Sequence, residues 1–428
     1  DYAMIGDLHT AALVGRNGSI DWLCVPRFDS GACFAALLGD ERNGRWWIAP
    51  AGEVIGDTRR YRDGTMVLET DFETAEGAVR LIDCMPVKGH GRTVVRAVEG
   101  LRGEVEMRME LVIRFDYGST IPWVQSGPTG TSAVAGPNSL YLWTDVETHG
   151  ENLKTVADFV VREGEDIPFT LTWNPSHEDA PEAISGLWAI SDTEDWWRRW
   201  SESCSFTGKY RDPVVRSLLV LKALTYKPTG GIIAAPTTSL PEALGGERNW
   251  DYRYCWMRDA ALTLDALMLG GYSQEALDFG AWVLRATASH PSQTQVLYGV
   301  SGERRLIEYE LDHLPGYEDS KPVRVGNAAA EQFQLDVFGE LLDAAYRGRE
   351  LTGSLIQSGW ARQTGLLAYL EEIWREPDEG IWEVRGPRRH FTHSKVMAWV
   401  GFDRAIKTVE RQGAQGDVER WKRVRQEI

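Results

Sequence analysis

The stretch VEMRMELVIRF (residues 105–115) decides the fold of the first half of the chain. Apolar residues stand at every second position from Val105 to Phe115, with mostly charged residues between them. Successive side chains of a strand point to opposite faces, so this period of two predicts a long strand with one buried and one wetted face.

The same alternation continues on both sides of that stretch. Shorter runs occur at 66–72, 79–83, 94–98, 139–144 and 169–173. Near the start, Asn17-Gly18 between two apolar runs predicts a tight hairpin. Many strands without intervening helices are typical of an antiparallel β-sandwich, which we assign to residues 1–185.

The periodicity changes near residue 180. The segment DTEDWWRRWSESCS (192–205) predicts a helix, which we interpret as a connector within a linker at 186–212. Residues 213–428 then read as a helical domain, with predicted helices near 213–227, 259–270, 274–289, 328–347, 356–375, 393–411 and 415–427. The loops at 228–257, 290–326 and 376–392 are long, and long loops of a helical domain usually carry function.

Length and charge narrow the class of protein. A chain of 428 residues with 43% hydrophobic residues is globular and exceeds one ordinary domain. Its net charge of −17 argues against nucleic acid and anionic membrane surfaces as partners. The sequence contains no apolar run of membrane-spanning length.

The cysteines and histidines predict neither a disulfide framework nor a metal site. The five cysteines are scattered without CxxC pairs, and His313 and His393 lack paired ligand spacing. We therefore expect no metal and no cofactor. The chain opens without a basic start or an apolar signal segment, so we expect a cytoplasmic protein. The sequence is compatible with a monomer or a homo-oligomer.

The most unusual composition lies in ERNWDYRYCWMRDA (247–260). Its fourteen residues include two Trp, two Tyr, three Arg and two Asp. Aromatic rings pack on the apolar face of a sugar, while Arg and Asp hydrogen-bond its hydroxyls, so this stretch predicts binding of a small carbohydrate. A helix N-terminal ion pair between Arg258 and Asp259 is an equally good local explanation.

Glu383 is a candidate general acid in the third long loop. It follows Ile381 and Trp382 and precedes Val384. Apolar surroundings raise the pKa of a carboxyl, which suits proton donation near neutral pH. The alternative is a surface glutamate that is paired with Arg385 or Arg388.

Several motifs together resemble glycoside hydrolase family 15, the glucoamylase family. The stretch at 247–260 is similar to the family signature. The resemblance continues in APTTSLPEALGG (235–246), GERRLIEYELDHLPGYEDSKPVRVGN (302–327) and GIWEVRGPRRHFTHSKVMAW (380–399). IGDLHTAALVGRNGSIDWLCVPRFDS (5–30) resembles the domain that precedes the catalytic one in bacterial members.

The resemblance implies a β-sandwich, a helical linker and an (α/α)6 barrel that cleaves α-glucosidic bonds from the non-reducing end with inversion. It implies that Glu383 is the general acid. The residues that it implies for substrate binding are Tyr252, Trp256, Arg258, Asp259, Arg324, Trp382, His393 and Lys395.

The sequence departs from the family pattern in two ways. The catalytic base, which the family carries in a late Tyr-x-Glu context, has no convincing counterpart here. Twelve helices make the full barrel and about seven are predicted here, so we expect an incomplete barrel and a chain that stops before the fold closes. Val384 stands where fungal members have a second Glu, and Asp319 stands near the place of a fungal Trp.

These departures favour the bacterial branch of trehalases and isomaltose-type glucohydrolases. The predicted substrate is trehalose, isomaltose or the end of a malto-oligosaccharide. Two alternatives stay open at this stage. One is an inverting phosphorylase that uses Arg388 and Arg389 for phosphate, and the other is a glucan-binding protein without catalysis.

Overall fold

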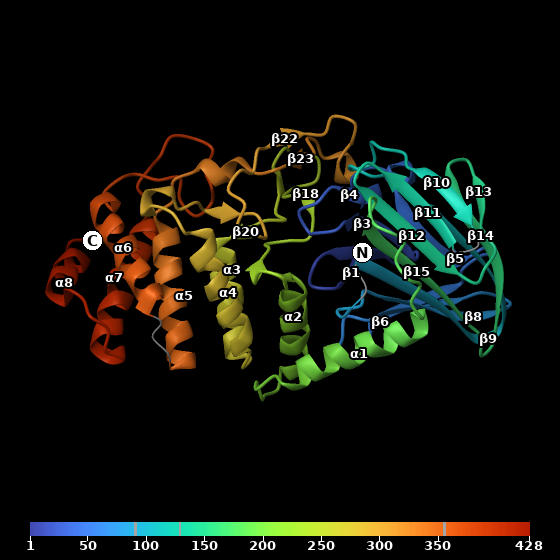
Figure 1. Ribbon diagram of the computed structural model, residues 1–428, viewed down its shortest axis with the longest axis horizontal. Helices are drawn as coiled ribbons and strands as arrows, with labels where there is room; N and C mark the ends of the chain where they lie inside the picture. Colours follow the sequence, from blue (N-terminus) through green and yellow to red (C-terminus); the bar gives the residue numbers. More distant parts are fainter. Residues whose placement is uncertain (90–91, 128–129, 354–356) are drawn as a thin grey trace.

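The β part of the molecule consists of two antiparallel layers that share one long strand, β9 (Arg92–Val112). The structure is a computed structural model and describes residues 1–89, 92–127, 130–353 and 357–428. The first half of β9 pairs with β8 and β15, and its second half pairs with β5 and β14 (Figure 1). The predicted sandwich of antiparallel strands is therefore confirmed.

The strands of one layer are β1 (Tyr2–Gly6), β2 (Ala11–Gly15), β3 (Ser19–Cys24), β4 (Ala32–Phe34), β5 (Arg45–Pro50), β13 (His149–Glu151) and β14 (Lys154–Arg162). Those of the other are β6 (Gly56–Tyr61), β7 (Leu68–Glu73), β8 (Gly77–Cys84), β10 (Trp123–Gly127), β11 (Gly130–Ala135), β12 (Asn138–Thr144) and β15 (Asp166–Pro175). The hairpin predicted at Asn17-Gly18 joins β2 to β3.

The predicted strands at 94–98 and 105–115 are two halves of β9. Between them the backbone at Gly100 passes so close to β14 that a Cβ there would lie 1.9 Å from the carbonyl oxygen of Arg162. Only glycine fits such an approach. Beyond this point Val105, Met107, Met109 and Leu111 are buried and alternate with more exposed residues, as the period of two predicted.

The sandwich core contains one buried ion pair. Arg96 Nε lies 2.7 Å from Asp83 Oδ1, and both side chains are inaccessible to solvent. The same guanidinium donates hydrogen bonds to the carbonyl oxygens of Trp46 at 2.5 Å and Gly18 at 2.7 Å, which belong to the opposite layer. Because each charged atom has a partner, this pair fixes how the two layers meet.

The helices follow the sandwich. They are α1 (Gly186–Glu202), α2 (Arg211–Ala223), α3 (Met257–Leu269), α4 (Ser273–Ala286), α5 (Asp336–Thr352), α6 (Gln357–Ile373), α7 (Thr392–Gln412) and α8 (Val418–Glu427). The connector α1 begins earlier than the predicted 192, because Ser185 caps it by accepting a hydrogen bond from the N–H of Trp188. The domain boundaries at 185 and 212 stay a prediction.

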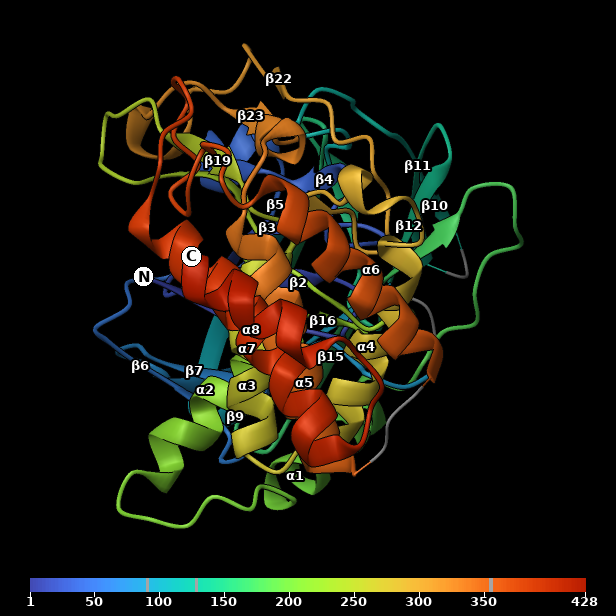
Figure 2. The same cartoon turned by 90° about the vertical axis from the view of Figure 1, so that its left-hand side faces the viewer.

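Helices α3, α5 and α7 are parallel neighbours. Arg347 of α5 pairs with Asp265 of α3 at 2.9 Å, and Asp343 of α5 pairs with Arg404 of α7. Helices α4, α6 and α8 each run back after a short connection, which gives three successive hairpins (Figure 2). This arrangement is part of an (α/α)6 barrel, as expected.

The helix predicted at 328–347 is in fact two elements. A 3-10 turn, η5 (Ala328–Glu331), precedes α5. Between them, the N–H groups of Phe333 and Leu335 donate to the carboxylates of Glu379 and Asp378 at 2.8 and 3.0 Å. Those bonds tie the segment to the third long loop instead of to an earlier turn of helix.

The long loops lie at one end of the helices, and the first two of them meet the sandwich (Figure 1). With their flanking residues, the loops contain 3-10 turns and short strands. These strands are β16 (Thr225–Tyr226), β17 (Gly231–Ile232), β18 (Thr238–Pro241), β19 (Asn249–Asp251), β20 (Cys255–Trp256), β21 (Leu297–Tyr298), β22 (Tyr309–Glu310) and β23 (Arg324–Val325). Trp22 Nε1 donates to the carbonyl of Pro236 at 2.8 Å, and Arg27 pairs with Glu303 at 2.8 Å. The sandwich therefore supports the loops directly. In the described part of the chain, every helix is too short or too polar to cross a membrane.

Candidate active site

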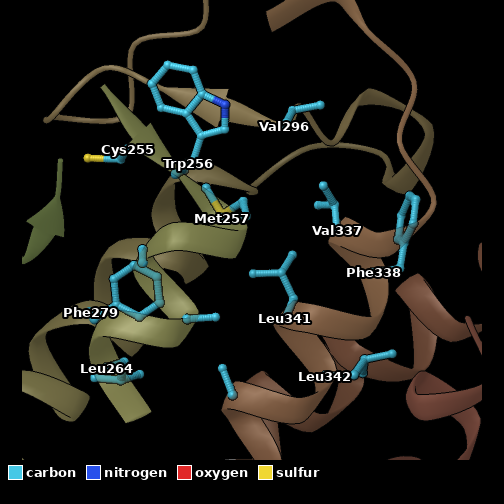
Figure 3. Packing of buried hydrophobic residues seen from close by; sticks show 14 of the residues in the cluster. Cys255, Trp256, Met257, Leu264, Phe279, Val296, Val337, Phe338, Leu341 and Leu342 are labelled. Atoms are coloured by element: carbon cyan, nitrogen blue, oxygen red, sulfur yellow. The ribbon is translucent and has the colours of Figure 1, made fainter. Parts of the chain in front are cut away.

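The first residues of α3, α5 and α7 meet the third long loop in one place. Trp256 directly precedes α3, and its indole Nε1 donates to Glu383 Oε1 at 2.5 Å. In Figure 3, Trp256 lies above the start of α3. Met257 lies below Trp256 and points toward the side where Val337 and Leu341 of α5 lie. The core between α3 and α5 thereby fixes the indole that holds Glu383.

Arg258 and Asp259 form the ion pair expected at a helix N-terminus, and this pair also belongs to the site. Arg258 Nη2 lies 2.9 Å from Asp259 Oδ2 and 3.9 Å from Glu383 Oε1. Its Nη1 donates to the carbonyl of Ile381 at 2.7 Å. The side chain of Asp259 is 39% exposed, which leaves it accessible to a ligand. The two explanations of this pair are therefore compatible.

Glu383 sits in a strained turn. Its φ of 54° lies in the left-handed region, which is costly for a residue other than glycine. Its N–H donates to the Gly380 carbonyl at 3.1 Å, and its own carbonyl accepts from Gln332 Nε2 at 3.3 Å. Such strain persists only where neighbours hold the backbone in place.

The alternative of a surface ion pair for Glu383 is wrong. Arg385 pairs with Glu308 at 2.7 Å and Arg388 pairs with Glu379 at 3.0 Å, so each predicted partner is occupied elsewhere. The side chain of Glu383 is 19% exposed.

The surroundings raise the pKa of Glu383. Burial is the main cause, while the indole hydrogen bond and the Arg258 charge act in the opposite direction. The carboxylates of Asp259 and Asp336 raise the pKa further. Glu383 therefore keeps its proton to a higher pH than an ordinary glutamate, as a general acid requires.

Two of the aromatic residues predicted for the site, Tyr252 and Trp256, lie beside this carboxyl. The ring of Tyr252 lies 5.5 Å from that of Trp256, at an interplanar angle of 49°. Trp382 is 79% exposed beside Glu383. The guanidinium of Arg324 is 4.5 Å from the centre of the Trp250 ring, and a role of Arg324 in substrate binding stays a prediction.

His393 and Lys395 differ in their positions. His393 lies in the first turn of α7, and the described residues offer its buried Nδ1 no hydrogen-bond partner. It lies close enough to Asp336 to influence the pKa of that carboxyl, so it faces the same cluster. Lys395 instead donates to the carbonyls of Trp374 and Glu376 at 2.5 and 3.0 Å. Its ammonium is thus occupied at the end of α6, and the structure does not bring it to Glu383.

Two carboxyls of α5 were missed by the sequence reasoning. Asp336 is fully buried, and neither of its oxygens has a hydrogen-bond partner within the described residues. Glu340 follows one turn later, and burial, with Asp336 and Asp343, raises its pKa to about 7. Two acids four residues apart in an otherwise apolar helical pattern were the available signal.

The described residues contain no group of three or more His, Cys, Asp or Glu placed to hold a metal ion. The five cysteines are buried and free. The expectation that the protein needs no cofactor stays a prediction.

A carboxyl that keeps its proton, beside an aromatic wall and an Arg–Asp pair, can protonate the leaving oxygen of a bound sugar. Fold and site together thus define a glycoside hydrolase of the helical-barrel type. Residues 208–428 match the family model of glycosyl hydrolases family 15, and residues 1–146 match the model described as trehalase-like, N-terminal. The chain belongs to family 15 of the glycosyl hydrolases.

Known proteins are similar over the whole chain. A trehalase of Mycolicibacterium smegmatis is 37% identical over 461 residues. The matched region covers 100% of this chain and 68% of that trehalase. A trehalase of Mycobacterium tuberculosis is 37% identical over 463 residues, with 100% and 67% coverage.

A bacterial glucoamylase solved with acarbose shares the fold. Its TM-score is 0.67 at 11% identity, and the match covers 99% of this chain and 65% of that one. The chain therefore spans about two thirds of the length of these proteins.

Proposed function

We propose that this chain carries the acid half of an inverting, exo-acting α-glucoside hydrolase that releases glucose from trehalose. One observation carries the proposal: the largely buried Glu383 carboxyl, held by Trp256 at 2.5 Å, lies 3.9 Å from Arg258 at the site of the predicted sugar grip. The trehalase names of relatives at 37% identity support trehalose as the substrate.

In the proposed mechanism Glu383 donates its proton to the glycosidic oxygen as the bond to the anomeric carbon breaks. Arg258 and Asp259 hold hydroxyls of the terminal glucose, and Tyr252 and Trp256 pack against its ring. A second carboxylate, roughly 6.5–9.5 Å from the acid in inverting enzymes, activates water on the opposite face. The described residues supply no assigned base.

The decisive experiment incubates the chain with trehalose, isomaltose and maltose and follows the first-formed glucose anomer by NMR. Inversion at an α-glucoside releases the glycone as β-glucose. We expect Glu383→Gln to lower turnover by about 10²–10⁴-fold while binding of a glucose analogue stays nearly unchanged.

Two results would overturn the proposal. Release of the glycone as α-glucose would exclude inversion, and full turnover by the Glu383→Gln variant would exclude Glu383 as the acid. Glucose release that requires inorganic phosphate would instead support a phosphorylase. Binding without any turnover would support a glucan-binding protein.

A further inference from the structure

Four side chains form a contact that joins all three long loops. Trp250 belongs to the first loop, Glu308 and Arg324 to the second, and Arg385 to the third. The guanidinium carbons of Arg385 and Arg324 lie 3.9 and 4.5 Å from the centre of the Trp250 ring. We call these four residues the guanidinium clasp.

Glu308 holds both arginines of the clasp. Arg385 donates to both of its carboxylate oxygens, at 2.9 and 2.7 Å, and Arg324 Nε lies 3.7 Å from Oε1. The N–H of Ala328 adds a third donor at 3.0 Å. Although burial acts to raise it, the hydrogen bond from Arg385 and the other donors hold the pKa of Glu308 below its ordinary value. Glu308 is therefore an anion over the working pH range.

Arg324 anchors the clasp to the sugar-binding stretch. Its Nη1 donates to the carbonyls of Glu247 and Asn249 at 2.8 and 3.3 Å, on either side of Arg248 in that stretch. The side chains of Arg324 and Glu308 are 13% and 16% exposed, whereas that of Arg385 is 40% exposed. Bidentate Arg–carboxylate pairs stacked on an indole are rigid, and lysine does not reproduce them.

Arg385 of the clasp follows the strained backbone of Glu383 by two positions. The residue between them is Val384, whose N–H donates to the Glu379 carbonyl at 3.2 Å. A left-handed non-glycine residue needs fixed neighbours on both sides. Gln332 and Arg258 donate to the carbonyls of Glu383 and Ile381, and the clasp residue Arg385 follows the turn in the chain.

From this geometry we infer that Glu308 and Arg385 are positioning residues that set where the Glu383 carboxyl stands. The inference rests on the proposed role of Glu383 as the acid. A displacement of about 1 Å at a reacting group can cost about 100-fold in rate. Release of the clasp is therefore expected to lower kcat by about 10–100-fold, with a smaller change in KM.

The test compares Glu308→Gln, Arg385→Gln and the double variant. The isosteric Gln at 308 keeps the acceptor for Ala328. Arg375→Gln is the matched control, because Arg375 also stacks on a Trp, 4.2 Å from the Trp374 ring, and also pairs with a glutamate, Glu427. That pair lies at the end of α6, outside the site. We expect the double variant to lose no more activity than the worse single variant, and the control to lose none.

The pH profile separates positioning from simple charge effects. The charged and titratable groups that face Glu383 are Arg258, Asp259, Asp336 and Tyr252. Loss of the Glu308 anion would by itself lower the pKa of Glu383, and loss of the Arg385 cation would raise it. A loosened turn lets water reach the carboxyl, so it lowers that pKa in both variants. We expect the alkaline limb of kcat/KM to move to lower pH in both.

Hydrogen exchange of residues 380–386 gives a readout that needs no activity. We expect faster exchange in both single variants and no change in Arg375→Gln. Unchanged exchange, opposite shifts of the alkaline limb, or losses that multiply in the double variant would each overturn the inference. If the unmutated chain turns over no α-glucoside, the proposed function fails, and the exchange measurement still decides whether the clasp holds the turn.

Discussion

Two Arg–Asp pairs in the stretch 247–260 show opposite uses of the same chemistry. Arg253 and Asp251 are inaccessible to solvent and 2.6 Å apart. Arg253 also donates to Ser30 O at 2.8 Å, so its donors are consumed where the helical half meets the sandwich. Arg258 and Asp259 are 18% and 39% exposed and face Glu383. A closed pair joins two parts of the fold, and an open pair stays available for a ligand.

The largest expected effect is on stability, at the closed pair. Arg253→Met leaves Asp251 buried without its cation, which typically costs about 3–5 kcal/mol. Urea unfolding measures this loss. Asp251→Asn added to Arg253→Met is the control, and it should recover part of the loss because no charge then stays buried unpaired. If Arg253→Met unfolded at the same urea concentration as the unmutated chain, Arg253 and Asp251 would not form a buried pair in solution.

The open pair should respond in activity instead. Arg258→Lys loses the forked contact with Asp259 and Ile381, so we expect kcat/KM to fall by about 10–100-fold, or about 1.4–2.8 kcal/mol. The free energy of unfolding should change by less than about 1 kcal/mol, since the lysine cation stays near Asp259. Steady-state kinetics and urea unfolding on the same variant check both values. If the free energy of unfolding fell by as much as the loss calculated from kcat/KM, the two pairs would not differ in kind.

A third effect is the pH dependence of stability that comes from Glu340, which lies near Arg258 of the open pair. The pKa of Glu340 is about 7 in the folded chain, against 4.5 for an ordinary glutamate. Folding therefore takes up a proton between these values, so stability falls as the pH rises from 4.5 to about 7. Glu340→Gln removes that loss.

We expect the Glu340→Gln variant to be more stable than the unmutated chain at pH 8 by about 1–3 kcal/mol, and equally stable at pH 4. Thermal unfolding across this range measures the difference. A constant difference at all pH values would mean that Glu340 titrates normally.

The smallest expected effect is at Trp382. Because its ring is 79% exposed, Trp382→Ala should change the unfolding free energy by less than about 0.5 kcal/mol. Loss of a stacking face should weaken binding of a glucoside by about 0.5–1.5 kcal/mol. Calorimetric titration with a glucose analogue measures this. A variant that binds as tightly as the unmutated chain would show that Trp382 lies outside the sugar site.

Local sequence patterns predicted most strands and helices correctly. They failed where residues distant in the sequence bind the backbone of a segment. The alternation in 105–115 predicted half of β9, because burial of one face of a strand is a local property. The helix predicted at 328–347 was wrong at its start, since Asp378 and Glu379, in a loop 43 and 46 residues later, accept hydrogen bonds from its backbone N–H groups.

The residues of the candidate site were likewise predicted only in part from the sequence. Glu383 and Arg258 were predicted from their sequence neighbours and from the family resemblance. Lys395 was predicted in the same manner, yet its ammonium is occupied by carbonyls at the end of α6. Asp336 and Glu340 were not predicted: their spacing is a local signal, but only the tertiary structure shows that they lie near Arg258.

The sequence by itself determined the residue types of the proposed sugar-binding stretch, the proposed acid and the two kinds of fold, because periodicity and motif are properties of neighbouring residues. Only the tertiary structure decided which Arg–Asp pair of the stretch 247–260 is closed and which is open. It also decided which charged groups lie around Glu383. Burial and charge pairing arise from elements far apart in the chain, so they exist only once α3, α5 and α7 and the three loops have come together.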